Sequence, residues 1–387
     1  MYDLGKQFHY EVSKLKANES SIIQGNKYRF TILTERLIRL EYSINGTFND
    51  YKTELVENRL FDVPKFNIRE DDAFLEITTK YFTLNYQKEM PFKGNSINPT
   101  KNLSVKINDS DNIWYYGHPE VRNYFGSNIS VEAKNESSQN RGLYSLEGFV
   151  SFDDSNSLIF DENGTIIENT NRYIDIYLFA YNKDFGYALQ DYFKLTGNPS
   201  LIPRYALGNW WCKSECYSDN DIYQLVENFN ECNVPISVML LDDKWRGMDE
   251  NNKLLNYTFN KQLFSNPGDF INNLHQKGIR VGVNINPELD ITKNEEMYNE
   301  AIKYIQPDKD GKIKFAPLNP RFIDVYFKLF IAKLESYGVD FFWNDYSNLS
   351  DLKSLWIMNH YFYLDLSKNI SKRGMLMSRN PLVASHK

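Results

Sequence analysis

The chain of 387 residues contains only three cysteines, Cys212, Cys216 and Cys232. This odd, small number, together with an N-terminus that has no apolar signal core, argues against a disulfide-stabilised secreted fold. Cys212 and Cys216 look like half of a metal site, but no second Cys/His pair follows at ligand spacing, so we expect no metal. These features together predict a cytoplasmic protein.

Long apolar runs and excess positive charge are also missing. No stretch reaches the roughly 20 apolar residues that span a bilayer, and the formal net charge is −7. We therefore expect neither a membrane nor a nucleic acid as a partner. Because no glycine-rich phosphate motif follows a predicted strand, no cofactor is expected either. Aromatic residues, in contrast, reach 15%, which is typical of β-rich cores and also suits stacking on sugar rings.

Two halves of the chain differ in their hydrophobic pattern. Residues 1–198 contain short alternating segments, such as 28–33, 37–42 and 81–86, separated by Asn, Gly and Asp. This pattern predicts an N-terminal antiparallel β-sandwich domain. A helix over 185–195 follows the last strand, and Gly and Pro then mark the domain boundary.

Residues 199–387 alternate between apolar strands and helices, which predicts a parallel sheet covered on both faces. The expected strands are 205–211, 236–242, 280–286, 339–344 and 375–378, and the expected helices are 219–232, 267–277, 294–306, 320–337 and 350–372. Polar and aromatic residues gather at the strand ends, which favours a (β/α)8-type barrel over an open doubly wound sheet. Only about five of the eight strands of such a barrel are expected, so we predict that the chain is a fragment.

The segment 337–346 holds the first candidate for catalysis. Gly338 follows a helical pattern, a short apolar strand comes next, and Trp343 and Asp345 stand at its end. A carboxylate at the end of a buried strand is costly to desolvate unless it is paired or functional, and catalytic groups of (β/α) barrels lie at this end. A second strand-end carboxylate, Asp242, and an arginine, Arg379, suggest carbohydrate chemistry.

Six segments in order resemble glycoside hydrolase family 31, the α-glucosidase and α-xylosidase family. They are 201–211, 234–245, 257–267, 274–281, 338–345 and 378–386. The resemblance implies a retaining hydrolase of α-glycosidic bonds that acts on an α-linked oligosaccharide or glycoside. It places Asp345 on the catalytic nucleophile, Asp242 on the carboxylate that binds sugar hydroxyls, Trp343 on an aromatic wall and Arg379 on an arginine that binds the sugar.

Three departures from the family pattern affect this interpretation. Lys244 stands where a second aspartate is common, and Asn344 stands where an aliphatic residue is common. The third departure is that the family's acid/base aspartate, expected shortly beyond His386, is missing, so we expect the chain alone to be inactive or poorly folded. The sequence also leaves open a non-catalytic carbohydrate-binding protein or a transglycosylase on the same scaffold.

Each site residue also has a purely structural alternative. Asp345 could cap a helix, and Asp242 with Asp243 could cap the turn that follows them. Trp343 could belong to the core, and Arg379 could lie on the surface. The sugar, the linkage and the oligomeric state do not follow from the sequence.

Overall fold

A computed structural model describes residues 4–8, 15–94, 102–124, 141–346, 351–369 and 371–378. The described residues divide into two compact units, one within residues 15–200 and the other formed by residues 4–8 with residues 201–378. Each unit is described by itself. Among the described residues, no helix combines the length and apolar character needed to cross a membrane.

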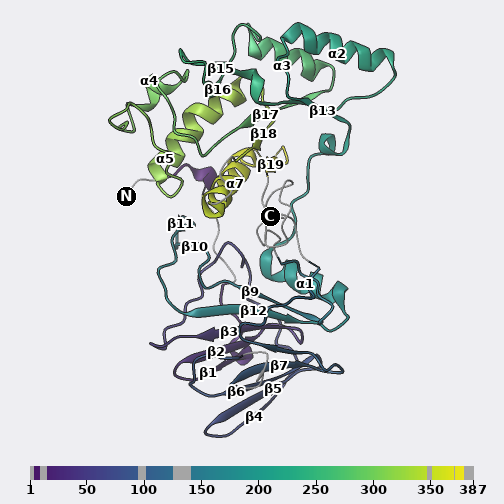
Figure 1. Ribbon diagram of the computed structural model, residues 1–387, viewed down its shortest axis with the longest axis vertical. Coiled ribbons are helices and arrows are strands. Elements are labelled where there is room, and N and C mark those ends of the chain that lie inside the picture. The colour runs from purple at the N-terminus through teal and green to yellow at the C-terminus, as the bar shows by residue number, and fades with distance from the viewer. Residues whose placement is uncertain are drawn as a thin grey trace. The chain divides into compact units, whose positions relative to one another are not determined.

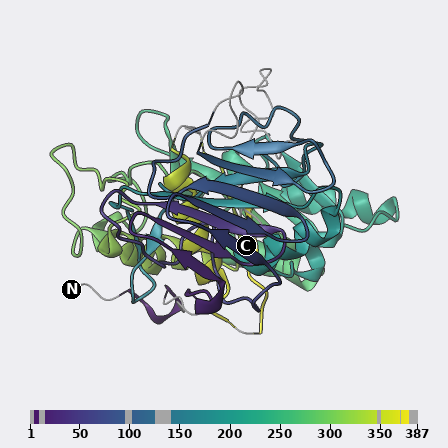
Figure 2. The same ribbon diagram turned by 90° about the horizontal axis from the view of Figure 1, so that it is seen from below.

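The first unit is an antiparallel β-sandwich, which confirms the predicted fold class of this half (Figure 1 and Figure 2). One sheet has the strand order β1-β2-β3-β12-β9 and the other the order β4-β5-β6-β7-β8. The strands of the first sheet are β1 (Ile22–Gln24), β2 (Tyr28–Ile32), β3 (Leu37–Tyr42), β12 (Ile174–Ala180) and β9 (Phe149–Asp153). Those of the second are β4 (Asn67–Glu70), β5 (Phe74–Thr78), β6 (Phe82–Gln87), β7 (Leu103–Ile107) and β8 (Ile113–Tyr115).

The core between these sheets follows from the alternation in their strands. Every second residue of β2 and β3, including Phe30 and Leu40, packs against Phe82 and Leu84 of β6 in one buried cluster. The helix α1 (Phe185–Thr196) and the short hairpin of β10 (Ile159–Phe160) with β11 (Ile166–Ile167) complete the unit. The predicted helix at 185–195 is therefore present.

The opposite face of the first sheet carries a buried cluster of charges. Arg29 on β2 lies opposite Glu41 on β3, which in turn lies opposite Asp175 on β12. Arg29 donates to both oxygens of Glu41 at 2.6 and 2.8 Å, and Arg39 donates to both oxygens of Asp175 at 2.8 and 2.6 Å. Asp50 accepts from both arginines. Because these charges are removed from water, each depends on its partners for stabilisation.

Asp154 brings a further carboxyl group close to this cluster, which predicts a pH-dependent stability. Its side chain is 1% exposed, and burial, together with Asp175, raises its pKa from 3.8 to about 7. The folded state therefore holds this proton more tightly than the unfolded chain does. The resulting stabilisation is complete below about pH 4 and is lost as the pH rises through about 7.

We expect Asp154→Asn to remove this dependence, because the amide stays neutral at every pH and can still accept the Thr53 hydroxyl that now donates at 2.9 Å. Relative to the wild type, the variant should gain stability between pH 5 and pH 8. Urea unfolding at the two pH values measures the difference. A gap between variant and wild type that stays constant with pH would show that Asp154 is already ionised in the folded protein.

The second unit contains a five-stranded parallel sheet with the strand order β13-β14-β17-β18-β19 (Figure 1). Its strands are β13 (Trp210–Lys213), β14 (Val238–Leu241), β17 (Arg280–Ile285), β18 (Phe341–Asn344) and β19 (Leu376–Ser378). All neighbouring pairs are parallel. Four of the five predicted strands are confirmed. The first, predicted over 205–211, begins only at Trp210, because residues 204–207 form a 3₁₀ turn. Within the described part of the chain the five strands form an open sheet rather than a closed barrel.

The connections between these strands are mostly helical, as predicted. They contain α2 (Asp219–Glu231), α3 (Pro267–Gln276), α4 (Tyr298–Ala301), α5 (Pro320–Val325), α6 (Ala332–Ser336) and α7 (Leu352–Leu366). The helix predicted over 320–337 contains a π-helical stretch, Tyr326–Ile331, between α5 and α6. The helix predicted over 294–306 is a shorter one, because only residues 298–301 are α-helical. A hairpin of β15 (Arg246–Met248) and β16 (Leu254–Phe259) was not predicted.

Residues near the N-terminus also cluster with this second unit. Phe8 is buried, and its ring lies 5.1 Å from that of Phe327 and 5.5 Å from that of Tyr361 on α7, measured between centroids. Gln7 donates to Asp365 at 3.3 Å. The sequence pattern had placed these residues in the sandwich domain 1–198, because a segment of this length carries no periodic signal of its own.

Candidate active site

One face of the parallel sheet brings the predicted strand-end residues together. Residues paired in register on parallel strands point to the same face, and Asn284 of β17 pairs with Trp343 of β18. Asp242 follows β14 one position beyond the pair of Leu241 with Val283, which aligns it with Asn284. Asp345 follows β18 on the same face as Trp343. The alternation of the strands therefore gathers two carboxylates, an amide and an indole at the carboxyl end of the sheet.

The packing of the apolar residues on this face depends on a glycine. Gly282 pairs in register with Phe341, and a Cβ atom at position 282 would lie 2.3 Å from Cζ of the Phe341 ring. The ring thus occupies the space that a side chain at position 282 would take. Phe341 then packs with Val238, Leu240 and Met375 in one apolar cluster below the polar residues.

Asp345 is held at the end of β18 by its backbone and its side chain. Its N–H donates to the carbonyl of Ile285 at 2.9 Å, which continues the pairing of β18 with β17. The Nδ2 atom of Asn284 lies 3.4 Å from Oδ2 of Asp345, at the long end of a hydrogen bond. These hydrogen bonds hold Asp345 to the sheet. Because the residue is only half-buried, it remains accessible from the surface.

Asp242 combines a structural and a candidate binding position. Its Oδ1 atom accepts from the N–H of Asp243 at 2.8 Å and caps the short 3₁₀ turn of Asp243–Trp245. The alternative that Asp242 caps the following turn is therefore realised, although a cap and a ligand contact are compatible in one carboxylate with two oxygens. Lys244, the first departure from the family pattern, points to Asp243 at 3.2 Å.

Trp343 is partly buried and packs against the apolar cluster of Val238, Leu240, Phe341 and Met375. Part of the indole therefore belongs to the core. Trp343 also pairs in register with Asn284, so the two side chains lie on the same face of the sheet. Arg379, the fourth predicted site residue, lies outside the described residues. The predicted roles of all four residues stay predictions.

Asn344, the second departure from the family pattern, faces the other side of the sheet. Its Nδ2 atom donates to Oδ1 of Asn359 on α7 at 3.1 Å, and Asn359 donates to the hydroxyl of Ser378 on β19 at 2.9 Å. This short chain of hydrogen bonds joins β18, α7 and β19. Asn344 therefore serves packing between the sheet and its helix rather than the candidate site.

A polar network beside Asp242 was not predicted from the sequence. Arg246 donates to the carbonyl of Asp243 at 3.1 Å and, through Nη1, to Asn256 at 3.2 Å and Asn286 at 3.0 Å. Burial lowers the pKa of this guanidinium from its ordinary value. Asn256 also clamps the backbone of Asn286, accepting from its N–H at 2.8 Å and donating to its carbonyl at 2.7 Å. The network ties the hairpin β15–β16 to the end of β17.

Glu295 anchors this hairpin from the other side. It is 5% exposed, and its two oxygens accept from the N–H of Asn256 at 2.5 Å, the N–H of Tyr257 at 3.0 Å and the hydroxyl of Thr258 at 2.7 Å. Burial raises the pKa of its carboxyl group, against the effect of these donors. A motif search could not find this residue, because its donors come mostly from the backbone of a distant strand.

We expect Glu295→Gln to lower the free energy of unfolding by about 1–3 kcal/mol, since one backbone N–H would then face an amide NH₂ instead of an acceptor. Glu231→Gln on the exposed end of α2 is the matched control and should change stability by less than about 0.5 kcal/mol. Thermal or urea unfolding measures both. If the two variants were equally stable, the three hydrogen bonds of Glu295 would contribute nothing net.

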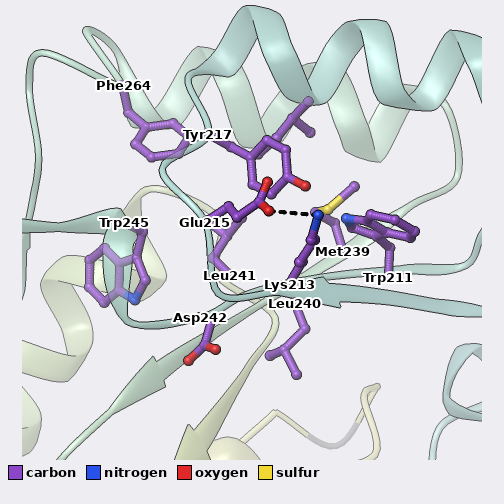
Figure 3. A pocket seen from close by; sticks show the side chains of 11 residues that line it. Trp211, Lys213, Glu215, Tyr217, Met239, Leu240, Leu241, Asp242, Trp245 and Phe264 are labelled. Carbon is purple, nitrogen blue, oxygen red and sulfur yellow. Dashed lines mark ion pairs between the residues drawn. The ribbon is translucent and has the colours of Figure 1, made fainter.

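A hollow beside β13 and β14 lies near the candidate site but is separate from it. It is lined by Trp211, Lys213, Glu215, Tyr217, Ile222, Met239, Leu240, Leu241, Asp242, Trp245 and Phe264. Figure 3 shows Asp242 and Leu240 pointing away from Tyr217 and Lys213, which lie on the helix-covered side with the ion pair of Lys213 and Glu215. Of the two candidate carboxylates, Asp242 lies at the edge of this hollow and Asp345 does not line it.

The parallel strands and the helical connections define a domain of the α/β class, with carboxylates at the ends of its strands. Residues 199–375 match the glycosyl hydrolases family 31 TIM-barrel domain. This segment, a little under half of the chain, is therefore similar to the barrel domain of that family.

Individual relatives show similarity over part of the chain. The chain is 26% identical to an α-xylosidase from Saccharolobus solfataricus over 178 residues, 45% of this chain and 23% of that protein. It is 28% identical to α-glucosidase 2 from Bacillus thermoamyloliquefaciens over 201 residues, 50% of this chain and 22% of that protein. The aligned part thus spans less than a quarter of either relative.

Solved structures share the fold over nearly the whole chain. A dextranase from Flavobacterium johnsoniae aligns with a TM-score of 0.61 and 16% identity, covering 94% of this chain and 53% of its own. An α-xylosidase from Xanthomonas citri aligns with a TM-score of 0.63 and 12% identity, covering 96% of this chain and 65% of its own. At these identities the similarity concerns the fold alone.

Proposed function

We propose that the protein cleaves α-glycosidic bonds as a retaining glycoside hydrolase, with Asp345 as the nucleophile. The observation that carries the proposal is the row of Asp242, Asn284, Trp343 and Asp345 on one face of a family 31 sheet. Relatives named as α-xylosidase, α-glucosidase and dextranase support an α-linked glycoside as substrate.

In the proposed reaction, a carboxylate oxygen of Asp345 forms a bond to the anomeric carbon while the bond to the leaving oxygen breaks and that oxygen takes a proton from a general acid. Water, giving up a proton to the same acid/base group, then attacks the same carbon and releases Asp345, so the configuration is retained over the two steps. We assign the acid/base role to none of the residues that the structure describes. Asp242 binds hydroxyls of the sugar through its carboxylate, and Trp343 offers an apolar ring face against which the sugar can stack. Arg379 binds the sugar in the same proposal.

A covalent trap tests the first step directly. A 5-fluoro-α-D-glucosyl or 5-fluoro-α-D-xylosyl fluoride carries a leaving group that needs no protonation, so labelling depends on the nucleophile and not on a general acid. We expect the intact mass to rise by one fluorosugar and peptide mapping to place it on Asp345. Sugar binding without labelling would instead favour a non-catalytic carbohydrate-binding protein.

Hydrolysis and transglycosylation differ only in what attacks the glycosyl-enzyme. The proposal is hydrolysis, in which water is the acceptor. Product analysis at high substrate concentration distinguishes the two, because transfer to a sugar hydroxyl would produce longer oligosaccharides.

A further inference from the structure

Asn284 is a buried amide in the middle of the candidate site. It lies on β17, the central strand of the five, and its side chain is 1% exposed. Its backbone carbonyl accepts from the indole N–H of Trp245 at 2.9 Å, which fixes the strand at this position. A buried polar side chain in the middle of a sheet is normally fully hydrogen-bonded or replaced by an apolar one.

The hydrogen bonds of this amide are incomplete. Nδ2 reaches Oδ2 of Asp345 at 3.4 Å, while Oδ1 has no hydrogen-bond partner among the residues the structure describes. An unpaired buried acceptor destabilises the fold, so a leucine would be the more stable choice if packing alone decided this position. Positions that keep a destabilising residue of this kind are expected mainly at functional sites.

We propose that Asn284 is a positioning residue that holds the Asp345 carboxylate in its attacking orientation. This inference rests on the proposed function of Asp345. A donor on Oδ2 restricts rotation of the carboxyl group and leaves Oδ1 as the attacking oxygen. Because so little of Asn284 is exposed, the side chain acts through Asp345 and not by touching the sugar.

Asn344 provides an internal comparison for this role. It is also fully buried, its Oδ1 atom also lacks a partner among the described residues, and it precedes Asp345 directly in the sequence. Its Nδ2 atom, however, donates to Asn359 on the opposite face of the sheet. The two asparagines therefore share burial and chemistry but differ in whether they reach the carboxylate.

The test compares Asn284→Leu, Asn284→Asp and Asn344→Leu in the covalent trapping reaction. Asn284→Leu removes the donor, and Asn284→Asp keeps the shape but puts a second carboxyl group beside Asp345 that competes with it for a proton. We expect both to lower the maximal labelling rate by about 10–100-fold, with less than about a twofold change in the half-saturating concentration, because the sugar contacts stay. Asn284→Leu should unfold at the same or higher urea concentration than the wild type. Asn344→Leu should keep a labelling rate much closer to that of the wild type.

Each outcome decides a separate question. A wild type that is never labelled overturns the proposed function and this inference with it. A wild type labelled on Asp345, with an Asn284→Leu variant labelled equally fast, overturns only the role of Asn284. A rate that falls together with urea stability, or equally in Asn344→Leu, would show that the asparagine supports the fold and not the carboxylate.

Discussion

Replacing Asp345 with asparagine is expected to slow covalent labelling by the fluorosugar on the order of 10⁴-fold or more, as is typical when the nucleophile itself is removed. The amide has the same shape and can keep a hydrogen bond to Asn284, but its neutral oxygen is a poor nucleophile toward the anomeric carbon. Intact-mass measurements over time give the rate for both proteins.

Asp310→Asn is a suitable control for this variant, because Asp310 is exposed in a loop of the same unit. It should be labelled at the wild-type rate. Urea unfolding of the Asp345→Asn protein checks that the fold is intact. Persistent labelling of Asp345→Asn at another carboxylate would identify a different nucleophile and contradict the assignment.

The largest effect on stability is expected in the sandwich unit. Asp175→Ala should lower its free energy of unfolding by about 3–5 kcal/mol, because it leaves the guanidinium of Arg39 buried without its bidentate partner. Arg39 is 1% exposed and cannot turn to water without breaking the sheet packing around it. Urea unfolding monitored by circular dichroism measures the loss.

The paired variant Arg39→Met with Asp175→Leu should recover most of this stability, since an apolar pair of similar volume avoids the unpaired charge. The exposed Asp72→Ala in the same unit is expected to change stability by less than about 0.5 kcal/mol. If Asp175→Ala proved as mild as the control, Asp50 and Glu41 would be sufficient partners for Arg39.

The sequence predicted the parallel sheet well because its strands are short apolar runs that end in polar residues. The row of Asp242, Trp343 and Asp345 follows from strand ends alone, since parallel strands bring their carboxyl ends to one edge. The position of Asn284 could have been inferred from the same register. It was missed because an asparagine inside an apolar run carries no motif.

The remaining features depend on partners far apart in the chain. The pairing of Arg39 with Asp175 joins β3 to β12, and a single sequence does not give that register. Glu295 holds backbone groups of β16, which no side-chain pattern records. The π-helical stretch at Tyr326–Ile331 has the same apolar spacing as an ordinary helix, so periodicity could not distinguish the two.

The ring of Phe341 over Gly282 has a consequence for any ligand of the sheet. With no side chain at position 282, the aromatic ring can sit low on the strands, where a Cβ would come within 2.3 Å of it. A larger residue at this position would lift the ring and make the site shallower. In the proposed site, the depth available to a sugar then depends on a residue that lies beneath it, and a side chain at position 282 is expected to reduce that depth.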